Sequence, residues 1–296
     1  TLYVAKEGSP IVIGVTEDSY YVASSTHGFL PFTDRFITLL DGEFAVLSLT
    51  RKEGLTITSI KEKARVTDRI YQTLEVSNAE DLSKGDFETF MLKEIYEQPV
   101  TTLATIIGRT NEAEGVAVLG GLFDHQEILR KAKHILITGC GTAYNAGEIG
   151  AYLLEKIAAI SVRTEIASEG RYKQLHTPVS DTVVFAISQS GETADTIDYI
   201  KELKRKEYQT FGVINVVGSA LAEITGKGVY TKAGSEIGVA STKAFTSQLG
   251  VIYLISLYVA RMKSMGIEQG VEFVKSLNEI PYLMKETLKT SEGIEL

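Results

Sequence analysis

The sequence is short of cysteine, has no tryptophan and contains no long uninterrupted hydrophobic run. Cys140 is the only cysteine among 296 residues, which excludes a disulfide framework and a cysteine-based metal site and fits a reducing compartment. The most apolar run, residues 249–260, falls short of the ~20 residues that span a bilayer, so we expect a buried helix there. The first residues lack a basic stretch followed by an apolar core, so no signal peptide is expected. These absences predict a cytoplasmic protein that does not enter a membrane.

The charge balance argues against a nucleic-acid partner. The formal net charge is −8, whereas nucleic-acid and acidic-membrane surfaces attract basic proteins. The hydrophobic share of 44% is ordinary for a globular protein, and the length allows one large or two medium domains. Four histidines are spread along the chain without metal-ligand spacing, so we predict no metal and treat them as structural or surface residues: His27, His125, His134 and His176.

Residues 1–75 have the pattern of a β-rich segment. The dipeptide Asp41-Gly42 lies between two β-type runs and predicts a hairpin that joins them. A thin meander of this kind needs a second layer to cover one face, and we find no segment nearby to supply it. We therefore expect part of a larger domain. The predicted strands are 11–15, 20–23, 36–40, 44–49 and 55–60.

Residues 76–132 are predicted to be a linker and a helical lead-in. Residues 76–90 are polar, and the next segment has apolar residues at helical spacing until Pro99, which is expected to end or kink the helix. From residue 133 to 296, strands and helices alternate, which predicts an α/β domain with a parallel sheet flanked by helices. Ligands of such sheets bind beyond the carboxyl ends of the strands. The predicted strands are 134–138, 162–167, 182–187, 210–215 and 229–231, and the main helices are 143–157, 239–262 and 267–288, with Ser168 capping a short one.

The hexapeptide Ser188-Gln189-Ser190-Gly191-Glu192-Thr193 is predicted to be a turn from a buried strand into a helix. Free N–H groups and the positive end of the helix dipole make such a turn an anion site, and the hydroxyls suit a phosphate monoester. The alternative is that Ser190 or Thr193 only caps the helix.

Two further turns of this kind follow strands of the same predicted sheet. The first runs from Gly139 to Ala143; a dinucleotide loop would need a third glycine where Tyr144 stands, so a turn that presents Thr142 to a ligand fits better. The other, residues 234–243, opens the long apolar helix, with Ser241 or Thr242 placed to cap it. Lys243 either neutralises an anion or is a solvated lysine. Together the three turns predict a site for a small polyol phosphate.

Several motifs also carry a family resemblance. The hexapeptide, the Cys-Gly-Thr-x-Tyr run at 140–144 and the segment 236–245 resemble the sugar isomerase (SIS) family, and more narrowly its glutamine–fructose-6-phosphate aminotransferases. Segments 91–99, 8–14 and 40–43 extend the likeness to the region that opens the synthase half and to the later part of the glutaminase domain. Residues 1–75 would then be part of a glutaminase domain and 133–296 the first SIS domain.

The resemblance implies a part of an enzyme that converts fructose 6-phosphate to glucosamine 6-phosphate, paired as a homodimer through its SIS domain and without metal or redox cofactor. Sugar-phosphate contacts would come from Ser188, Ser190 and Thr193 with Gln189 beside them, from Thr142, and from the backbone around Val239 and Ser241. Ala143 stands where the family often has serine.

No catalytic residue carries over, because the family's N-terminal cysteine nucleophile and its second SIS unit have no counterpart in this sequence. We therefore expect residues 1–296 to be an internal fragment and Cys140 to be a buried structural residue. Two alternatives stay open: a non-catalytic SIS module that senses a phosphosugar, and a stand-alone phosphosugar isomerase. A regulator would more often carry a DNA-binding helical domain where this sequence has its β-rich segment.

Overall fold

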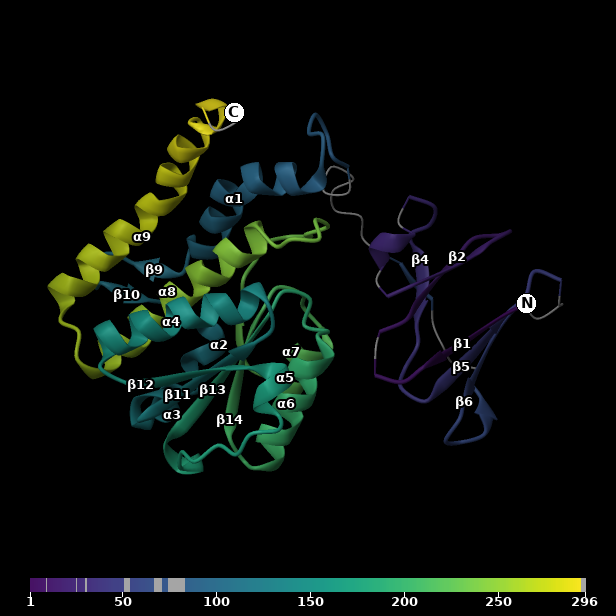
Figure 1. The fold of residues 1–296 in the computed structure, drawn as a ribbon, viewed down its shortest axis with the longest axis horizontal. Coiled ribbons are helices and arrows are strands. Elements are labelled where there is room, and N and C mark those ends of the chain that lie inside the picture. The colour runs from purple at the N-terminus through teal and green to yellow at the C-terminus, as the bar shows by residue number, and fades with distance from the viewer. Residues whose placement is uncertain are drawn as a thin grey trace. The chain divides into compact units, whose positions relative to one another are not determined.

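The computed structural model describes residues 1–8, 10–24, 26–29, 31–50, 54–66, 71–73 and 83–293. The chain forms two compact units, Thr1–Ser83 and Lys84–Leu296, which are described separately (Figure 1). The first part of the polar stretch expected to be a linker, residues 76–82 of 76–90, lies outside the described residues.

The N-terminal unit consists of two four-stranded antiparallel sheets. One has the strand order β1-β5-β6-β7 and the other β3-β2-β4-β8. Apolar side chains from both sheets form one core cluster, so the segment supplies its own second layer, contrary to expectation. The cluster contains Val4, Ile13, Ile37, Leu39, Ala45, Leu47 and Ile57. The strands are β1 Leu2–Lys6, β2 Val12–Val15, β3 Tyr20–Ala23, β4 Arg35–Thr38, β5 Glu43–Leu47, β6 Leu55–Ser59, β7 Ala64–Arg65 and β8 Gln72–Thr73.

The hairpin predicted at Asp41-Gly42 is wrong. Strand β4 pairs with β2 and β8, whereas β5 pairs with β1 and β6, so the turn passes the chain from one sheet to the other. Gly42 has a φ of +76°, which explains the glycine at this turn. The turn signal is local, but the pairing partner of each strand is set by the faces that must be buried together.

The second unit begins with a helix, α1 Phe90–Ile106, that continues past Pro99. The hydroxyl of Thr89 caps it by accepting a hydrogen bond from the N–H of Leu92 at 3.1 Å. Short elements follow before the main sheet: β9 Thr110–Asn111, β10 Val116–Ala117, α2 Gly120–Phe123 and α3 Gln126–Lys131.

The second unit is built on a five-stranded parallel sheet with the order β12-β11-β13-β14-β15. This confirms the predicted parallel sheet flanked by helices. Ser168 lies inside a short helix rather than capping it, because that helix begins one residue earlier. The strands are β11 His134–Gly139, β12 Ser161–Ile166, β13 Thr182–Ser188, β14 Gln209–Ile214 and β15 Gly228–Tyr230. The helices are α4 Thr142–Ala158, α5 Ala167–Gly170, α6 Ala194–Arg205, α7 Ala220–Thr225, α8 Lys243–Lys263 and α9 Ile267–Leu288.

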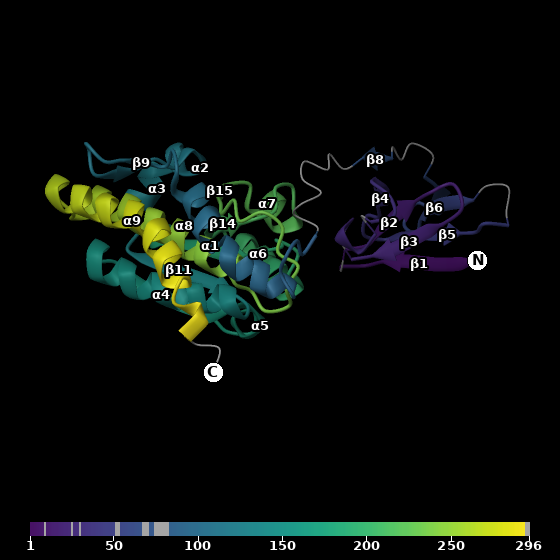
Figure 2. The same cartoon turned by 90° about the horizontal axis from the view of Figure 1, so that it is seen from above.

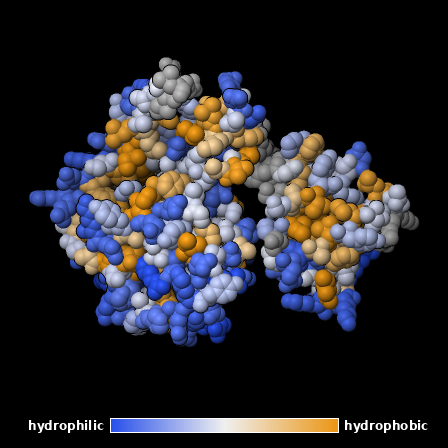
Figure 3. All heavy atoms as spheres, in the orientation of Figure 1, coloured by the Kyte–Doolittle hydropathy of each residue, from blue (hydrophilic) through white to orange (hydrophobic). Residues whose placement is uncertain are grey.

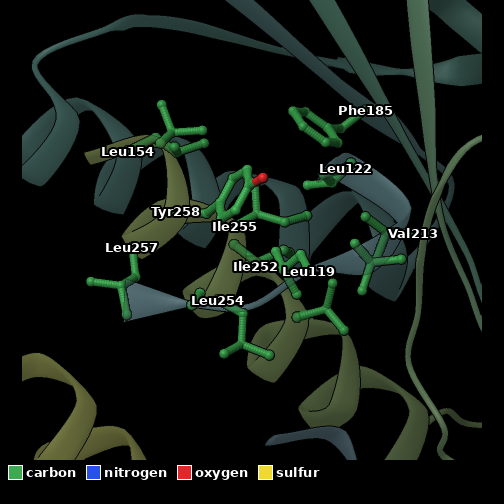
Figure 4. Close-up of a cluster of buried hydrophobic side chains, with 14 of the residues drawn as sticks. Leu119, Leu122, Leu154, Phe185, Val213, Ile252, Leu254, Ile255, Leu257 and Tyr258 are labelled. Carbon is green, nitrogen blue, oxygen red and sulfur yellow. The ribbon is translucent and has the colours of Figure 1, made fainter. Parts of the chain in front are cut away.

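Helices cover both faces of this sheet, as the two views in Figures 1 and 2 show. Alternate residues of β13 divide between two cores: Val183, Phe185 and Ile187 pack with α4 and α8, while Val184 and Ala186 pack with α6 and α7. Figure 4 shows the first core, where side chains of α8 meet Phe185 and Val213.

Helix α8 is long and apolar enough to cross a membrane by length and composition alone. However, 78% of its most apolar window is buried inside the unit. The helix packs against α4 and α1, so its composition is that of a core helix.

Candidate functional site

Two of the three predicted turns lie next to each other because they leave neighbouring strands, β11 and β13. The hydroxyl of Thr196, in the first turn of α6, donates to Sγ of Cys140 at 3.8 Å and so joins the two turns. A Cβ on Gly139 would lie 2.9 Å from the carbonyl oxygen of Ile187, so the absence of a side chain there permits the close approach.

The hexapeptide forms the expected turn between β13 and α6. The N–H of Gly191 donates to Oγ of Ser188 at 3.0 Å, and the N–H of Glu192 donates to Oγ of Ser190 at 3.1 Å. Thr193 is the N-cap residue of α6, but its side chain makes no capping hydrogen bond. Among the hydrogen bonds of the described residues, neither the side chain of Ser190 nor that of Thr193 caps α6.

The hexapeptide turn is fixed against the start of α7. Oε1 of Glu192 accepts from the N–H of Ala220 at 2.8 Å, and the N–H of Leu221 donates to the carbonyl of Gly191 at 2.9 Å. Gly191 has a φ of +68°, and a Cβ there would lie 2.0 Å from Oγ of Ser219. The charge of Glu192 is thus directed to α7, and the turn requires glycine at 191.

The turn from Gly139 to Ala143, the first of the three predicted turns, presents one hydroxyl group and one backbone N–H group. Gly141, with a φ of +57°, is the N-cap residue of α4, and Thr142 begins that helix with an exposed side chain. Ala143 is only 7% exposed and belongs to the core. A contact from residue 143 to a ligand would therefore come from its N–H group.

The third turn is held to the end of β14 by Asn215. Its Oδ1 accepts from the hydroxyl of Thr231 at 2.9 Å and from the N–H of Ala233 at 2.8 Å, and its Nδ2 donates to the carbonyl of Gly234 at 2.7 Å. The start of the turn, Gly234, is therefore fixed next to the end of β14.

The expectation that Ser241 or Thr242 caps α8 is wrong. Oε1 of Glu236 accepts from the N–H groups of Thr242 and Ala244, at 2.8 and 3.0 Å, and so takes the capping role. A carboxylate also suits the positive end of the helix dipole. Oγ of Ser241 is buried, and within the described residues it has no hydrogen-bond partner. Val239, at the tip of the turn, is fully exposed.

Of the two alternatives for Lys243, the solvated lysine is wrong. Its side chain is buried, and its Nζ lies 2.6 Å from Oε2 of Glu97 on α1. The spacing of 146 residues between these partners explains why the sequence pattern gave no sign of the pair.

Cys140 is half-buried rather than fully buried, because it lies at the rim where the two turns meet. Among the histidines, His134 lies on β11 and the ring of His125 packs edge-on against Phe211, with centroids 5.5 Å apart. Across the described ranges, no three His, Cys, Asp or Glu side chains gather as metal ligands would.

Known proteins are similar to this chain in sequence and in fold. The sequence profile of the SIS domain family matches residues 128–258. A glutamine–fructose-6-phosphate aminotransferase (isomerizing) from Chlorobaculum tepidum is 38% identical over 99% of this chain, and one from Pyrococcus horikoshii is 37% identical over 99%. The chain covers 47% and 46% of these two relatives, so it spans about half their length.

Solved structures resemble this chain in fold. The C-terminal domain of a glucosamine-fructose-6-phosphate aminotransferase from Francisella tularensis matches with a TM-score of 0.67 and 39% identity, over 72% of this chain and 59% of that one. A glucosamine-6-phosphate deaminase from Thermotoga maritima matches with a TM-score of 0.51 at 20% identity, over 70% of this chain and 58% of that one, a likeness of fold alone.

Proposed function

Because residues 128–258 belong to the SIS domain family and nearly the whole chain is similar to one half of the aminotransferases, we propose that this chain is part of a glutamine-dependent enzyme that converts fructose 6-phosphate to glucosamine 6-phosphate. The portion described here binds the sugar phosphate. The observation that carries the proposal is the hexapeptide turn, whose two serine hydroxyls shape a loop in front of the uncapped N-terminus of α6.

Each turn has a part in the proposed site. The N–H groups at the start of α6 and the hydroxyls of Ser188, Ser190 and Thr193 hold the phosphate, with Gln189 at the edge of the same turn. Thr142 and the N–H of Ala143 contact the sugar from one side. The backbone around Val239 and Ser241 contacts it from the third turn.

We propose the domain scheme that the resemblance implies: residues 1–75 as the later part of a glutaminase domain, 76–132 as linker and lead-in, and 133–296 as the first SIS domain. The two-sheet β unit supports this reading over an SIS regulator with a helical DNA-binding domain. Ammonia from glutamine would reach the sugar within one polypeptide, and the chemistry needs no metal or redox cofactor.

The protein is proposed to act as a cytoplasmic homodimer. Helix α8 is mostly buried inside its own unit. Exposed apolar side chains on α1 and α9 offer a surface instead, and apolar patches interrupt the polar surface in that region of Figure 3. They are Tyr96, Val100, Leu103, Tyr282 and Leu283.

Truncation of the phosphate-binding hydroxyls tests the proposal. Ser190→Ala and Thr193→Ala should each weaken fructose 6-phosphate binding about 10- to 100-fold, since a hydrogen bond to a charged group contributes roughly 1.5–3 kcal/mol. Ser180→Ala is the matched control, because Ser180 lies before the opposite end of the same strand and donates to Asp181. Unchanged affinity in both test variants, measured by calorimetry, would remove the hexapeptide from the site.

A further inference from the structure

We infer that two carboxylates of α1, Glu94 and Glu97, are positioning residues that preset the third turn for the sugar. The inference rests on the proposed function, because it concerns the part of the site that contacts the sugar rather than the phosphate. The sequence pattern does not reveal these residues, since they lie more than 140 positions from the segment they hold.

Glu94 is bound to the backbone of the third turn. Its side chain is buried, with the residue 2% exposed. Oε1 accepts from the N–H groups of Ile237 and Gly238 at 2.5 and 3.1 Å, and Oε2 lies 3.2 Å from the same N–H of Gly238. A buried carboxylate is costly unless such donors satisfy it, so the turn and the carboxylate fix each other.

Gly238 is what lets the turn come this close. A Cβ at position 238 would lie 2.5 Å from Oε2 of Glu94 and 3.4 Å from Cα of Met91. The turn therefore approaches α1 by its backbone, one residue before the exposed Val239 and three before Ser241.

Glu97, one helical turn after Glu94, fixes the other end of the same segment. Its Oε2 binds Nζ of Lys243 at 2.6 Å, and the Lys243 side chain is only 7% exposed. Residues three apart on a helix share a face, so both carboxylates of α1 point to the third turn. Glu236 then closes the segment on itself by capping α8.

The third turn is therefore bound to α1 on both sides of the residues proposed to face the ligand. Between β15 and α8 it has no helix or strand of its own. Its geometry thus depends on side-chain contacts, and a carboxylate that orders it before binding lowers the entropic cost of binding the sugar. The phosphate is bound by the hexapeptide turn, which these carboxylates do not contact in the interactions described.

The test separates the sugar contact from the phosphate contact. Glu94→Gln keeps the shape but replaces one acceptor oxygen by an N–H₂ group that faces the donor of Gly238. With the intact chain, we expect the Kd for fructose 6-phosphate to rise about tenfold, while the Kd for inorganic phosphate changes less than twofold. Glu127→Gln is the matched control, since Glu127 lies exposed on α3 and pairs with Lys131.

Hydrogen exchange gives a readout that does not depend on a ligand. The amides of Ile237 and Gly238 should exchange faster in Glu94→Gln, and not in Glu127→Gln. If Glu94→Gln does not fold, Glu97→Gln is the substitute variant, because Glu97 is partly exposed. It should raise the Kd for fructose 6-phosphate and leave the Kd for inorganic phosphate unchanged. Equal weakening of both ligands, or no change in fructose 6-phosphate affinity, overturns the inference. A wild-type chain that does not prefer fructose 6-phosphate over fructose overturns the proposed function itself.

Discussion

Oγ of Ser188 accepts a hydrogen bond from the N–H of Gly191 at 3.0 Å, across the sharpest part of the turn between β13 and α6. The serine oxygen is thereby used in shaping the turn, while its proton stays available to donate, to Thr193 at 3.4 Å or to a bound anion. One side chain thus serves both the local structure and the proposed ligand.

Replacement of Gly191, the donor of this hydrogen bond, tests the geometry of the turn through the stability of the protein. Gly191→Ala would place a methyl group 2.0 Å from Oγ of Ser219 in a left-handed backbone conformation. We expect a loss of about 2–4 kcal/mol in the free energy of unfolding, from backbone strain and from displacement of α7. Chemical denaturation measures it.

Gly218→Ala is the matched control, because Gly218 also has a positive φ but its Cβ would meet no atom within 4 Å. It should cost only the strain of the backbone, about 1–2 kcal/mol. If the two variants lose the same stability, the clash with Ser219 does not exist in solution.

Tyr199 should make stability fall at high pH. Burial first, and then the charge of Glu165, raise its pKa to about 12, from an ordinary value of 10.0. The folded state favours the protonated phenol. The contribution of Tyr199 to the free energy of unfolding is therefore fully present below pH 10 and is lost as the pH rises toward 12. The whole difference corresponds to about 2.7 kcal/mol.

Tyr199→Phe should therefore flatten the decline in unfolding free energy between pH 10 and 12. Tyr172→Phe, at an exposed position, should leave the decline as steep as in the wild type. A profile in which the two variants behave alike would contradict the assignment to Tyr199.

Residues 1–296 alone should bind the sugar phosphate without converting it. Aldose–ketose conversion needs a positioned acid/base group, and the polar groups nearest the turns are engaged elsewhere: Glu192 with α7, and Lys243 with Glu97. Fructose 6-phosphate with excess ammonium should give no glucosamine 6-phosphate by mass spectrometry. Clear turnover would mean that Glu192, Lys243 or the exposed Glu169 acts as a base.

The sequence predicted the parts of the molecule that depend on neighbouring residues. The apolar run 182–187 and the hexapeptide that follows gave the strand, the turn and the start of α6, because burial and turn chemistry are local signals there. The alternation of strands and helices gave the parallel sheet for the same reason.

Contacts between distant residues could not be predicted. Asp41-Gly42 is a sound turn signal, yet the strands on its two sides belong to different sheets. Lys243 lies at the start of a helix, where a solvated lysine is ordinary, and only the folded chain brings Glu97 to it. Glu236 caps α8 from six residues upstream, a spacing outside the usual capping patterns.

The three turns are proposed to form a site for a phosphorylated sugar, and calorimetric titration of the intact chain with fructose 6-phosphate and with fructose tests this most directly. Fructose 6-phosphate should bind at least 100-fold more tightly than fructose, by about 2.7 kcal/mol or more, because its phosphate meets the uncapped N-terminus of α6 and the hydroxyls before it. Equal affinity for the two sugars would contradict it.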